Sequence, residues 1–372
     1  MSAESISRQL LESAGITING PNKGDIKVNN PALYKRVLGG GSLALGESYM
    51  DGWWDCDRLD QFFDKVLRAK LDQKVVNNKR LMLTLLAAKL INMQNKVRAW
   101  KTADHYNTGN FLYQKMLGKS MTYSCGYWKK AKNLDQAQED KLDLVCRKLH
   151  LKPGMKVLDI GCGWGSFAKH AATKYKVKVV GITISEEQAK FARESCKGLP
   201  VDIVVQDYRD TQGTFDRVVS IGMAEHVGYK NLRTYLQKVA SVLKDDGLFL
   251  YHSIGALKGT LLTDAWIRKY IFPNASLPSM AQVGRASEGL LIIEDWHNFG
   301  QDYDTTLMEW HKNFVKHWPE IKKSGNYDDR FFRMWTYYLR TCAGMFRSRQ
   351  NNMLYQGVFS KDGFPGRYEA VR

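Results

Sequence analysis

The sequence predicts an α/β protein in which a doubly wound parallel sheet follows a small N-terminal α+β domain. Three observations predict this fold. A strand-like run at residues 156–160 enters a glycine-spaced turn at residues 161–165, and strand-like and helix-like segments alternate from there to the end of the chain. The 372 residues also exceed the length at which a single hydrophobic core keeps growing, so a second, smaller domain is expected.

The N-terminal domain is expected to span residues 1–71. It should begin with a helix that has Ile6 and Leu10 on one face, followed by β-like runs at 16–18 and 26–28 and a helix opened by Pro31. The Gly39-Gly40-Gly41 run is interpreted as a flexible turn, because no strand-to-helix pattern marks it as an anion site. An aromatic cluster can form a small core or, in part, a lipid-contacting face; its members are Tyr49, Trp53, Trp54, Phe62 and Phe63.

A basic helical connector is expected at residues 72–101. From Lys65 to Lys101, ten basic residues face a single acid, Asp72. Apolar residues recur there at helical spacing, namely Leu83, Leu86, Leu90, Met93 and Val97. Such a basic amphipathic helix can pack on its own protein, contact a membrane surface or form a dimer interface.

Residues 102–372 are expected to form one catalytic domain. Its strands are predicted at 156–160, 177–182, 201–205, 215–221, 247–253, 291–296 and 354–360, with helices between most of them. A long insertion at about 256–289 follows a strand end and carries Trp266, Tyr270, Ile271 and Phe272. Because ligands of such sheets bind beyond the strand ends, this insertion is the expected lid.

The glycine-spaced turn predicts a site for a nucleotide-like ligand. A phosphate-binding P-loop would end in Gly-Lys-Ser/Thr, which Gly165-Ser166-Phe167 does not match. The dinucleotide fingerprint would place its third glycine where Ser166 stands. The turn instead resembles the acid-x-Gly-x-Gly-x-Gly pattern of S-adenosylmethionine-dependent methyltransferases, formed here by Asp159, Gly161, Gly163 and Gly165.

Further cofactor contacts are expected at the ends of the next two strands. The second strand lacks the terminal acid that commonly holds the ribose, so Thr183 and Gln188 are expected to supply hydrogen bonds instead. After the third strand, Asp207 is expected to accept from the adenine amino group and Tyr208 to stack on the base. Each of these residues can alternatively be a helix cap or a surface polar residue.

Composition indicates the compartment and the kind of partner. The net charge of +17 predicts a polyanionic partner, either nucleic acid or an anionic lipid surface. No run of about 18 apolar residues occurs, and the first 19 residues lack the apolar core of a signal peptide, so a cytoplasmic protein is expected. The six cysteines form no Cys-x-x-Cys pair, which indicates neither a disulfide framework nor a structural metal.

The chemistry is expected at the ends of the fourth and fifth strands. Glu225 follows the fourth strand and His252 lies near the end of the fifth, so both should approach the pocket. The alternative is that they form a buried structural pair. Two aromatic-rich segments, 123–128 and 296–303, flank this region in the sequence.

In this order, the segments resemble those of the bacterial cyclopropane fatty acid synthase family and, less closely, of the mycolic acid cyclopropane synthases. The similarity runs over essentially the whole chain. Its most specific part is residues 45–54, because general methyltransferases lack the N-terminal domain. The resemblance implies a Rossmann-like class I methyltransferase fold and methylene transfer from S-adenosylmethionine to the cis double bond of a phospholipid acyl chain. It also implies a homodimer that associates peripherally with the inner face of the membrane.

The resemblance also implies roles for individual residues. Attack by the alkene leaves a carbocation, which aromatic faces can stabilise; the candidates are Tyr270, Phe272, Phe299 and Tyr303. In the family the base is a bound bicarbonate, whose holders here would be Cys125, Glu225, His252, Tyr303 and the backbone of Ile254. Glu225 is expected to orient His252.

Tyr123 and Ser124 would contact the methionine end of the cofactor. Cys342 corresponds to a family cysteine that can be suspected as a nucleophile, although the mechanism needs no thiolate and a buried cysteine is the simpler interpretation.

Two other enzyme classes and one non-enzymatic class compete with this interpretation. A nucleic-acid methyltransferase is disfavoured. Base N-methylation commonly uses an Asn/Asp-Pro-Pro-Tyr/Phe motif, and cytosine C5 methylation uses a cysteine after a proline, but the chain has no Pro-Pro and no cysteine that follows a proline. No nucleic-acid partner is therefore expected. A methyltransferase for a small amine shares much of the catalytic domain, so only the N-terminal domain argues against it. A non-enzymatic membrane-binding protein is disfavoured by the glycine turn together with Glu225 and His252.

Overall fold

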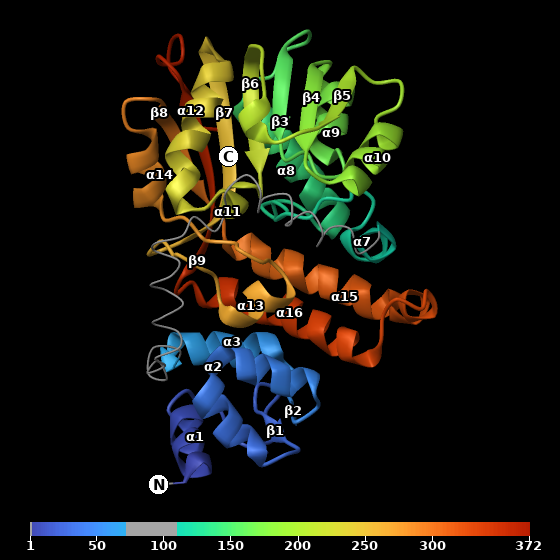
Figure 1. The fold of residues 1–372 in the computed structure, drawn as a ribbon, viewed down its shortest axis with the longest axis vertical. Coiled ribbons are helices and arrows are strands. Elements are labelled where there is room, and N and C mark those ends of the chain that lie inside the picture. Colours follow the sequence, from blue (N-terminus) through green and yellow to red (C-terminus); the bar gives the residue numbers. More distant parts are fainter. Residues whose placement is uncertain (1, 72–109) are drawn as a thin grey trace. The chain divides into compact units, whose positions relative to one another are not determined.

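The computed structural model of the chain describes residues 2–71 and 110–372 and forms two compact units (Figure 1). One unit comprises Met1–Ile91, Leu262–Pro273 and Tyr303–Asn352; the other comprises Asn92–Leu261, Asn274–Asp302 and Met353–Arg372. These units differ from the expected domains, because two later segments pack with the N-terminal one and the expected lid is divided between the units. The basic connector predicted at residues 72–101 lies outside the described residues.

The second unit contains a seven-stranded sheet in the order β5-β4-β3-β6-β7-β9-β8. The strands are β3 (Lys156–Ile160), β4 (Lys178–Thr183), β5 (Val201–Val205), β6 (Phe215–Ile221), β7 (Leu243–Ala256), β8 (Ile292–Asn298) and β9 (Asn352–Ser360). Pairing is parallel from β5 to β7 and antiparallel between β8 and β9. The chain builds outward from β3 to β5 and then returns to place β6 on the other side of β3. The ends of β3 and β6 therefore mark the switch point at which such sheets bind ligands.

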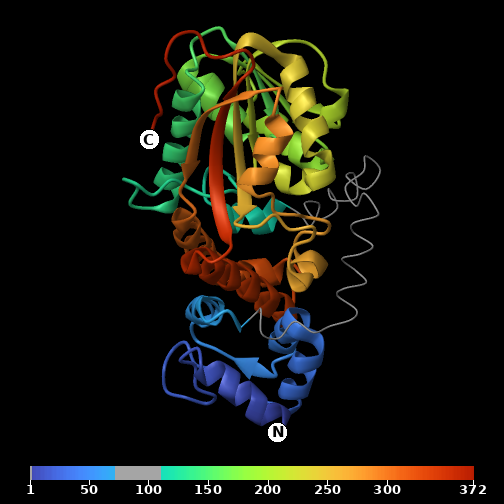
Figure 2. The same ribbon diagram turned by 90° about the vertical axis from the view of Figure 1, so that its left-hand side faces the viewer.

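Helices cover both faces of this sheet, as Figure 2 shows with α8 on one side and α12 on the other. The helices of this unit are α7 (Asn110–Leu117), α8 (Leu134–Lys148), α9 (Ser166–Tyr175), α10 (Glu186–Ser195), α11 (Ala224–Val227), α12 (Leu232–Val242) and α14 (Met280–Ser287). Successive strand residues point to opposite faces. Leu158 and Phe249 accordingly join the core under α12 and α14, whereas Val157 and Leu248 join the core under α8 and α9.

The sheet confirms the predicted fold class, and each predicted strand is present with small shifts at its ends. The largest difference is β7, which begins at Leu243 rather than at residue 247 and ends at Ala256. Two short 3-10 helices, Tyr208–Asp210 and Tyr229–Asn231, follow β5 and α11. Among the described parts of the chain, no helix is long and apolar enough to span a bilayer.

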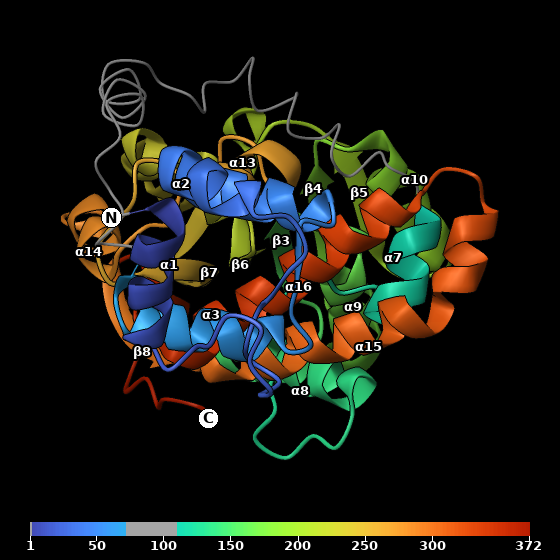
Figure 3. The same cartoon turned by 90° about the horizontal axis from the view of Figure 1, so that it is seen from below.

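The first unit is mainly helical (Figure 3). Its elements are α1 (Ala3–Glu12), β1 (Lys27–Val28), α2 (Ala32–Met50), β2 (Trp54–Asp55), α3 (Leu59–Arg68), α13 (Ala265–Tyr270), most of α15 (Gln301–Lys323), and α16 (Asp329–Ser348). The triple glycine expected as a turn lies inside α2, where the left-handed φ of 58° at Gly41 kinks the helix. A single kink replaces the expected flexible turn because Gly39 and Gly40 continue the helical segment.

The predicted aromatic cluster forms a core in this unit. Trp54 is fully buried and packs against Tyr49 and Phe62 at ring distances of 5.3 and 5.4 Å. Tyr337 of α16 contacts Tyr49 and Phe63, each at 5.5 Å. These contacts explain why a segment near the C-terminus belongs with the N-terminal one.

A buried ion cluster joins α3 to α16. Asp60 is fully buried and accepts hydrogen bonds from Arg58, Arg340 and Arg347 at 2.6 to 3.0 Å. Arg347 also forms a two-fold contact with Asp304 at 2.8 Å. Burial opposes ionisation of Asp60, but the hydrogen bonds from Arg58 and Arg347 hold the pKa of this carboxyl well below its ordinary value. The carboxylate therefore stays charged and holds the two helices together.

The close approach of α16 and α3 depends on Gly344. A Cβ atom added at this position would lie 2.5 Å from the backbone oxygen of Asp60 and 2.9 Å from Cβ of Phe63. We expect Gly344→Ala to destabilise the first unit by about 1–3 kcal/mol, because the helices must move apart. Gly39→Ala is the matched control, since a Cβ there meets no atom within 4 Å. Thermal unfolding of both variants checks this, and equal melting temperatures would contradict the close packing.

Candidate cofactor pocket and catalytic residues

A cavity lies at the carboxyl ends of β3, β4 and β6, beside the predicted glycine turn. Gly161 and Gly163 line it with positive φ values of 81° and 54°, a conformation that favours glycine. A Cβ on Gly161 would also lie 2.9 Å from Cγ of Met223, whereas a Cβ on Gly163 would meet no atom within 4 Å. The backbone of the turn is therefore exposed to a ligand in the cavity.

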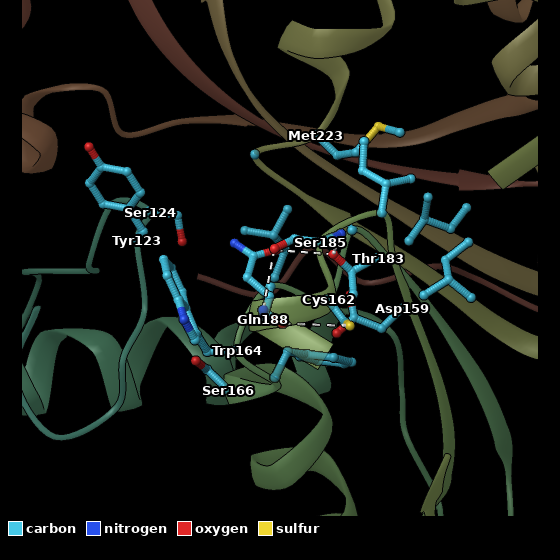
Figure 4. A pocket seen from close by; sticks show the side chains of 18 of the residues that line it. Tyr123, Ser124, Asp159, Cys162, Trp164, Ser166, Thr183, Ser185, Gln188 and Met223 are labelled. Atoms are coloured by element: carbon cyan, nitrogen blue, oxygen red, sulfur yellow. Dashed lines mark hydrogen bonds between the residues drawn. The ribbon is translucent and has the colours of Figure 1, made fainter. Parts of the chain in front are cut away.

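The structure brings most of the predicted cofactor residues together around this cavity (Figure 4). Those that line it are Tyr123, Ser124, Asp159, Gly161, Gly163, Thr183, Gln188, Asp207 and Tyr208. Gly165 is not among the lining residues. It caps α9 with a φ of 82°, and a Cβ there would lie 3.0 Å from Cβ of Ala192. Its place is therefore in the packing of α9 against α10.

At the end of β4, the predicted polar pair is already connected. Thr183 Oγ1 donates to Gln188 Oε1 at 3.0 Å and accepts from the N–H of Ser185 at 3.2 Å. Ser185 also caps α10 by accepting from the backbone N–H of Gln188. The cap formed by Ser185 therefore holds Thr183 and Gln188 in place, and both of these side chains line the cavity.

At the end of β5, Asp207 and Tyr208 have a partner that the sequence analysis missed. Arg209 donates to Asp207 through its backbone N–H at 2.9 Å and through its guanidinium at 2.8 Å. The same guanidinium lies 4.6 Å from the ring centre of Tyr208. Tyr208 is buried and packs edge-on against Tyr235, so Arg209 occupies part of the ring surface expected to stack on a base.

Lys141 is a second residue that the sequence analysis missed. It lies on α8, is fully buried and lines the cavity, where its Nζ donates to Ser124 Oγ at 2.8 Å. A signal was available, since position 141 follows Gln138 and precedes Leu142 and Val145 on the inward face of the helix. A lysine on a buried face needs a polar partner, which makes it a candidate for function.

Glu225 lies in the first turn of α11, beside the end of β7, and is largely buried. Its Oε1 accepts from the backbone N–H of Ile254 at 2.6 Å, and its Oε2 has no partner among the described residues. Burial raises the pKa of Glu225 to about 7, which outweighs the opposing hydrogen bonds from its own backbone N–H, from Ile254 and from Ser253. A carboxyl that exchanges a proton near neutral pH is suited to acid–base chemistry.

His252 lies on β7 with one ring nitrogen paired. Gln356 Nε2 lies 3.1 Å from Nδ1 of His252, and an amide nitrogen can only donate. Nδ1 therefore accepts, and in the neutral ring the proton is on Nε2, which has no partner in the described structure. Burial, together with the nearby charge of Lys141, Lys148 and His297, lowers the pKa of His252 well below its ordinary value. The ring is thus neutral and presents one N–H donor.

These contacts correct two expectations. Glu225 does not orient His252 in this structure. Glu225 bonds to the backbone of Ile254, and the side chain that contacts the His252 ring is Gln356 of β9. The N–H of Ile254 is donated to Glu225 and its carbonyl accepts from Ser253, so the Ile254 backbone has no hydrogen left for a bound anion. Gln356 was missed because a single polar residue in a strand is usually solvated, whereas this one is fully buried.

The remaining predicted residues lie in different units. Cys125 is fully buried next to Ser124, and Phe299 contacts the ring of His252 edge-on at 5.9 Å. Tyr303 belongs to the first unit and stacks on Phe346 at 4.6 Å. Cys342 is in the first unit as well, where burial and the charge of Asp264 raise the pKa of its thiol to about 12. This favours the thiol form and a packing role for Cys342.

The raised pKa of Glu225 predicts a measurable dependence of stability on pH. The folded protein holds this proton up to pH of about 7, whereas an unfolded glutamate loses it near 4.5, so the wild type loses stability as pH rises through this window. Glu225→Gln does not titrate. We expect its advantage in unfolding free energy over the wild type to grow by up to about 3 kcal/mol across the window. Thermal unfolding of both proteins at several pH values measures this, and a constant difference would contradict it.

Comparison with known proteins identifies the family of this chain. Residues 93–356 match the family model described as mycolic acid cyclopropane synthetase. This chain belongs to that family. Over 357 residues, this chain is 56% identical to the cyclopropane-fatty-acyl-phospholipid synthase of Escherichia coli K12, covering 96% of this chain and 93% of that protein. The resemblance inferred from the motifs is thereby confirmed.

Solved structures give the same family and fold. The cyclopropane synthase MmaA2 of Mycobacterium tuberculosis is 27% identical with a TM-score of 0.64, covering 70% of this chain and 97% of that one. Mycolic acid cyclopropane synthase CmaA1, solved with S-adenosylhomocysteine, has the same identity, TM-score and coverage. Coclaurine N-methyltransferase has a TM-score of 0.71 at 22% identity, covering 85% of this chain and 99% of that one, which supports the fold alone.

Proposed function

We propose that this protein transfers a methylene group from S-adenosylmethionine to the cis double bond of unsaturated acyl chains in membrane phospholipids. The observation that carries the proposal is the 56% identity over 96% of the chain to a cyclopropane-fatty-acyl-phospholipid synthase. That similarity includes the N-terminal unit, whereas the mycolic acid enzymes of known structure cover 70% of the chain. The assignment as a cyclopropane-fatty-acyl-phospholipid synthase therefore rests on both units.

The cavity fits the cofactor by its own chemistry. Asp159 presents a buried Oδ2 that has no partner among the described residues, and the turn at Gly163 leaves its backbone open to a ligand. Thr183 and Gln188 would hold the ribose hydroxyls, while Tyr123 and Ser124 would contact the amino-acid end. When bound, S-adenosylmethionine supplies the carbon that becomes the ring methylene.

His252 and Glu225 are suited to hold a small anion that takes up a proton. With the proton on Nε2, His252 donates and cannot accept at that atom. Glu225 adds a buried Oε2 that carries a proton below a pH of about 7. Two donors at one end of the sheet fit bicarbonate, and we include it in the proposal as the anion that Cys125, Glu225 and His252 would hold. In this arrangement the protein positions the proton acceptor, and the very acidic proton of the reacting carbon needs only a weak base.

A phospholipid substrate also accounts for the basic composition. Each lysine or arginine near an anionic membrane contributes roughly 1 kcal/mol of attraction, so part of the +17 charge would hold the protein at the surface reversibly. We propose a peripheral position on the cytoplasmic face of the membrane and a homodimer, which would double the docking surface. Sedimentation velocity tests the dimer, and a single monomeric species at micromolar concentration would contradict it.

Vesicle binding should depend on lipid charge and on salt. We expect the protein to co-sediment with vesicles that contain anionic phospholipid and to do so less as salt rises, because the Debye length falls from about 10 Å at 0.1 M to about 3 Å at 1 M. Zwitterionic vesicles are the control. Equal binding to both kinds of vesicle at low salt would contradict electrostatic docking.

The reaction is tested with purified protein, S-adenosylmethionine and vesicles of an unsaturated phospholipid. Mass spectrometry of the acyl chains should show gain of one methylene and loss of the double bond, and vesicles of a saturated phospholipid should show no change. Cofactor binding with methylation of a soluble amine or of nucleic acid, and none of the acyl chain, would contradict the proposal.

A further inference from the structure

Lys141 is a buried cation at the cofactor cavity that the proposed chemistry does not use. Its side chain is fully buried, and its single hydrogen bond within the described structure is the one to Ser124 Oγ at 2.8 Å. An ammonium carries three hydrogens, so two remain for other partners. The hydroxyl of Ser124 alone compensates poorly for removing the ammonium of Lys141 from water. An anionic ligand beside Lys141 would stabilise this buried charge.

Asp159 has the complementary property in the same cavity. It is almost fully buried at the end of β3, and its Oδ2 has no partner in the described parts of the chain. Burial lowers the pKa of Lys141 to about 7 and raises that of Asp159 to about 7, and the attraction between the two charges opposes both shifts. Both groups line the cavity and their charges attract each other, yet no ion pair within 4.0 Å joins them in the described parts of the chain. Each therefore keeps hydrogen-bonding capacity for a ligand.

A ligand with both charges would satisfy this pair. The amino-acid end of S-adenosylmethionine carries an α-carboxylate and an α-ammonium on one carbon atom. We infer that Lys141 binds the α-carboxylate of the cofactor and that Asp159 lies opposite its α-ammonium. The inference rests on the proposed function, because it assumes that this cavity takes S-adenosylmethionine. It also explains why Ser124, at the expected amino-acid end of the cavity, is the residue to which Lys141 is bonded.

The test compares ligands with and without the amino-acid end. Calorimetry would measure the binding of S-adenosylhomocysteine and of 5′-methylthioadenosine, which keeps the adenosine and the thioether. Lys141→Met should weaken S-adenosylhomocysteine about 10- to 100-fold, as expected for the loss of one charged hydrogen bond. Its affinity for 5′-methylthioadenosine should stay within about two-fold of wild type. This ligand lacks the amino-acid end, and contacts that are independent of each other contribute almost additively to binding.

Lys169→Met is the matched control. Lys169 is also bonded to a serine hydroxyl, Ser195 Oγ at 3.3 Å, but it is exposed and does not line the cavity. Both affinities should be unchanged in this variant. If Lys141→Met loses affinity for the two ligands equally, Lys141 has a structural role and the inference is overturned; unchanged affinity for S-adenosylhomocysteine overturns it as well.

A measurement on the wild type keeps the inference testable if Lys141→Met does not fold. The α-carboxamide of S-adenosylhomocysteine removes the negative charge and should bind about 10-fold or more weakly than the parent ligand. Equal binding of the carboxamide would overturn the inference. If the wild type binds none of these adenosine ligands, the proposed function itself fails, and this result is distinct from a failure of the Lys141 assignment.

Discussion

His252→Ala should lower the rate of methylene transfer by roughly 100-fold or more, the range typical for loss of a positioned group in proton transfer. The variant removes the Nε2–H donor that would hold the proton-accepting anion. Cofactor affinity should be retained, since His252 is not among the residues that line the cofactor cavity. A loss confined to kcat, with binding of S-adenosylhomocysteine unchanged, separates a catalytic role from a structural one.

His252→Gln is the conservative comparison for this residue. Glutamine can place an amide N–H near the position of Nε2, so we expect part of the activity to return. The rate at saturating cofactor and vesicles should then order as wild type, His252→Gln and His252→Ala. Full activity in the alanine variant would contradict the anion site, and equal loss of cofactor binding in both variants would assign His252 to packing.

Asp60→Ala should destabilise the first unit by about 3–5 kcal/mol, because three partly buried arginines lose the carboxylate that they share. Arg58, Arg340 and Arg347 all donate to this carboxylate, which is fully buried. Asp64→Ala is the control, because its partner Arg68 is 54% exposed and surface ion pairs contribute about 0–1 kcal/mol. Thermal unfolding that is equal for the two variants would show that the cluster contributes little.

Local patterns were sufficient to predict the sheet and the cofactor cavity. The glycine turn, the strand that precedes it and the ends of β4 and β5 are each formed by residues close in sequence, so their spacing predicts their place. Gly165 shows the limit of this reasoning, because the same motif includes a glycine required for helix packing rather than for the ligand.

The contacts that could not be predicted join residues far apart in the sequence. Gln356 reaches His252 across 104 positions, and Arg340 reaches Asp60 across 280. Contacts between such distant residues produce no repeating pattern in the sequence from which they could be predicted. For the same reason, the packing of Tyr303–Asn352 with the N-terminal segment was missed, although its aromatic and basic residues are visible in the sequence. Lys141 was missed although it lies among the buried residues of α8, because a lysine was assumed to be solvated and its position on the inward face was not weighed.

The most direct test of the central claim uses S-adenosylmethionine with a fully deuterated methyl group and vesicles of an unsaturated phospholipid. If the protein forms a cyclopropane ring, the acyl chain should gain one carbon that keeps two of the three deuterium atoms, and the double bond should disappear. The third deuterium leaves with the proton acceptor, which is the step assigned to the region of His252 and Glu225. Retention of all three deuterium atoms on the lipid, or their appearance only on a soluble amine or nucleic acid, would contradict the account.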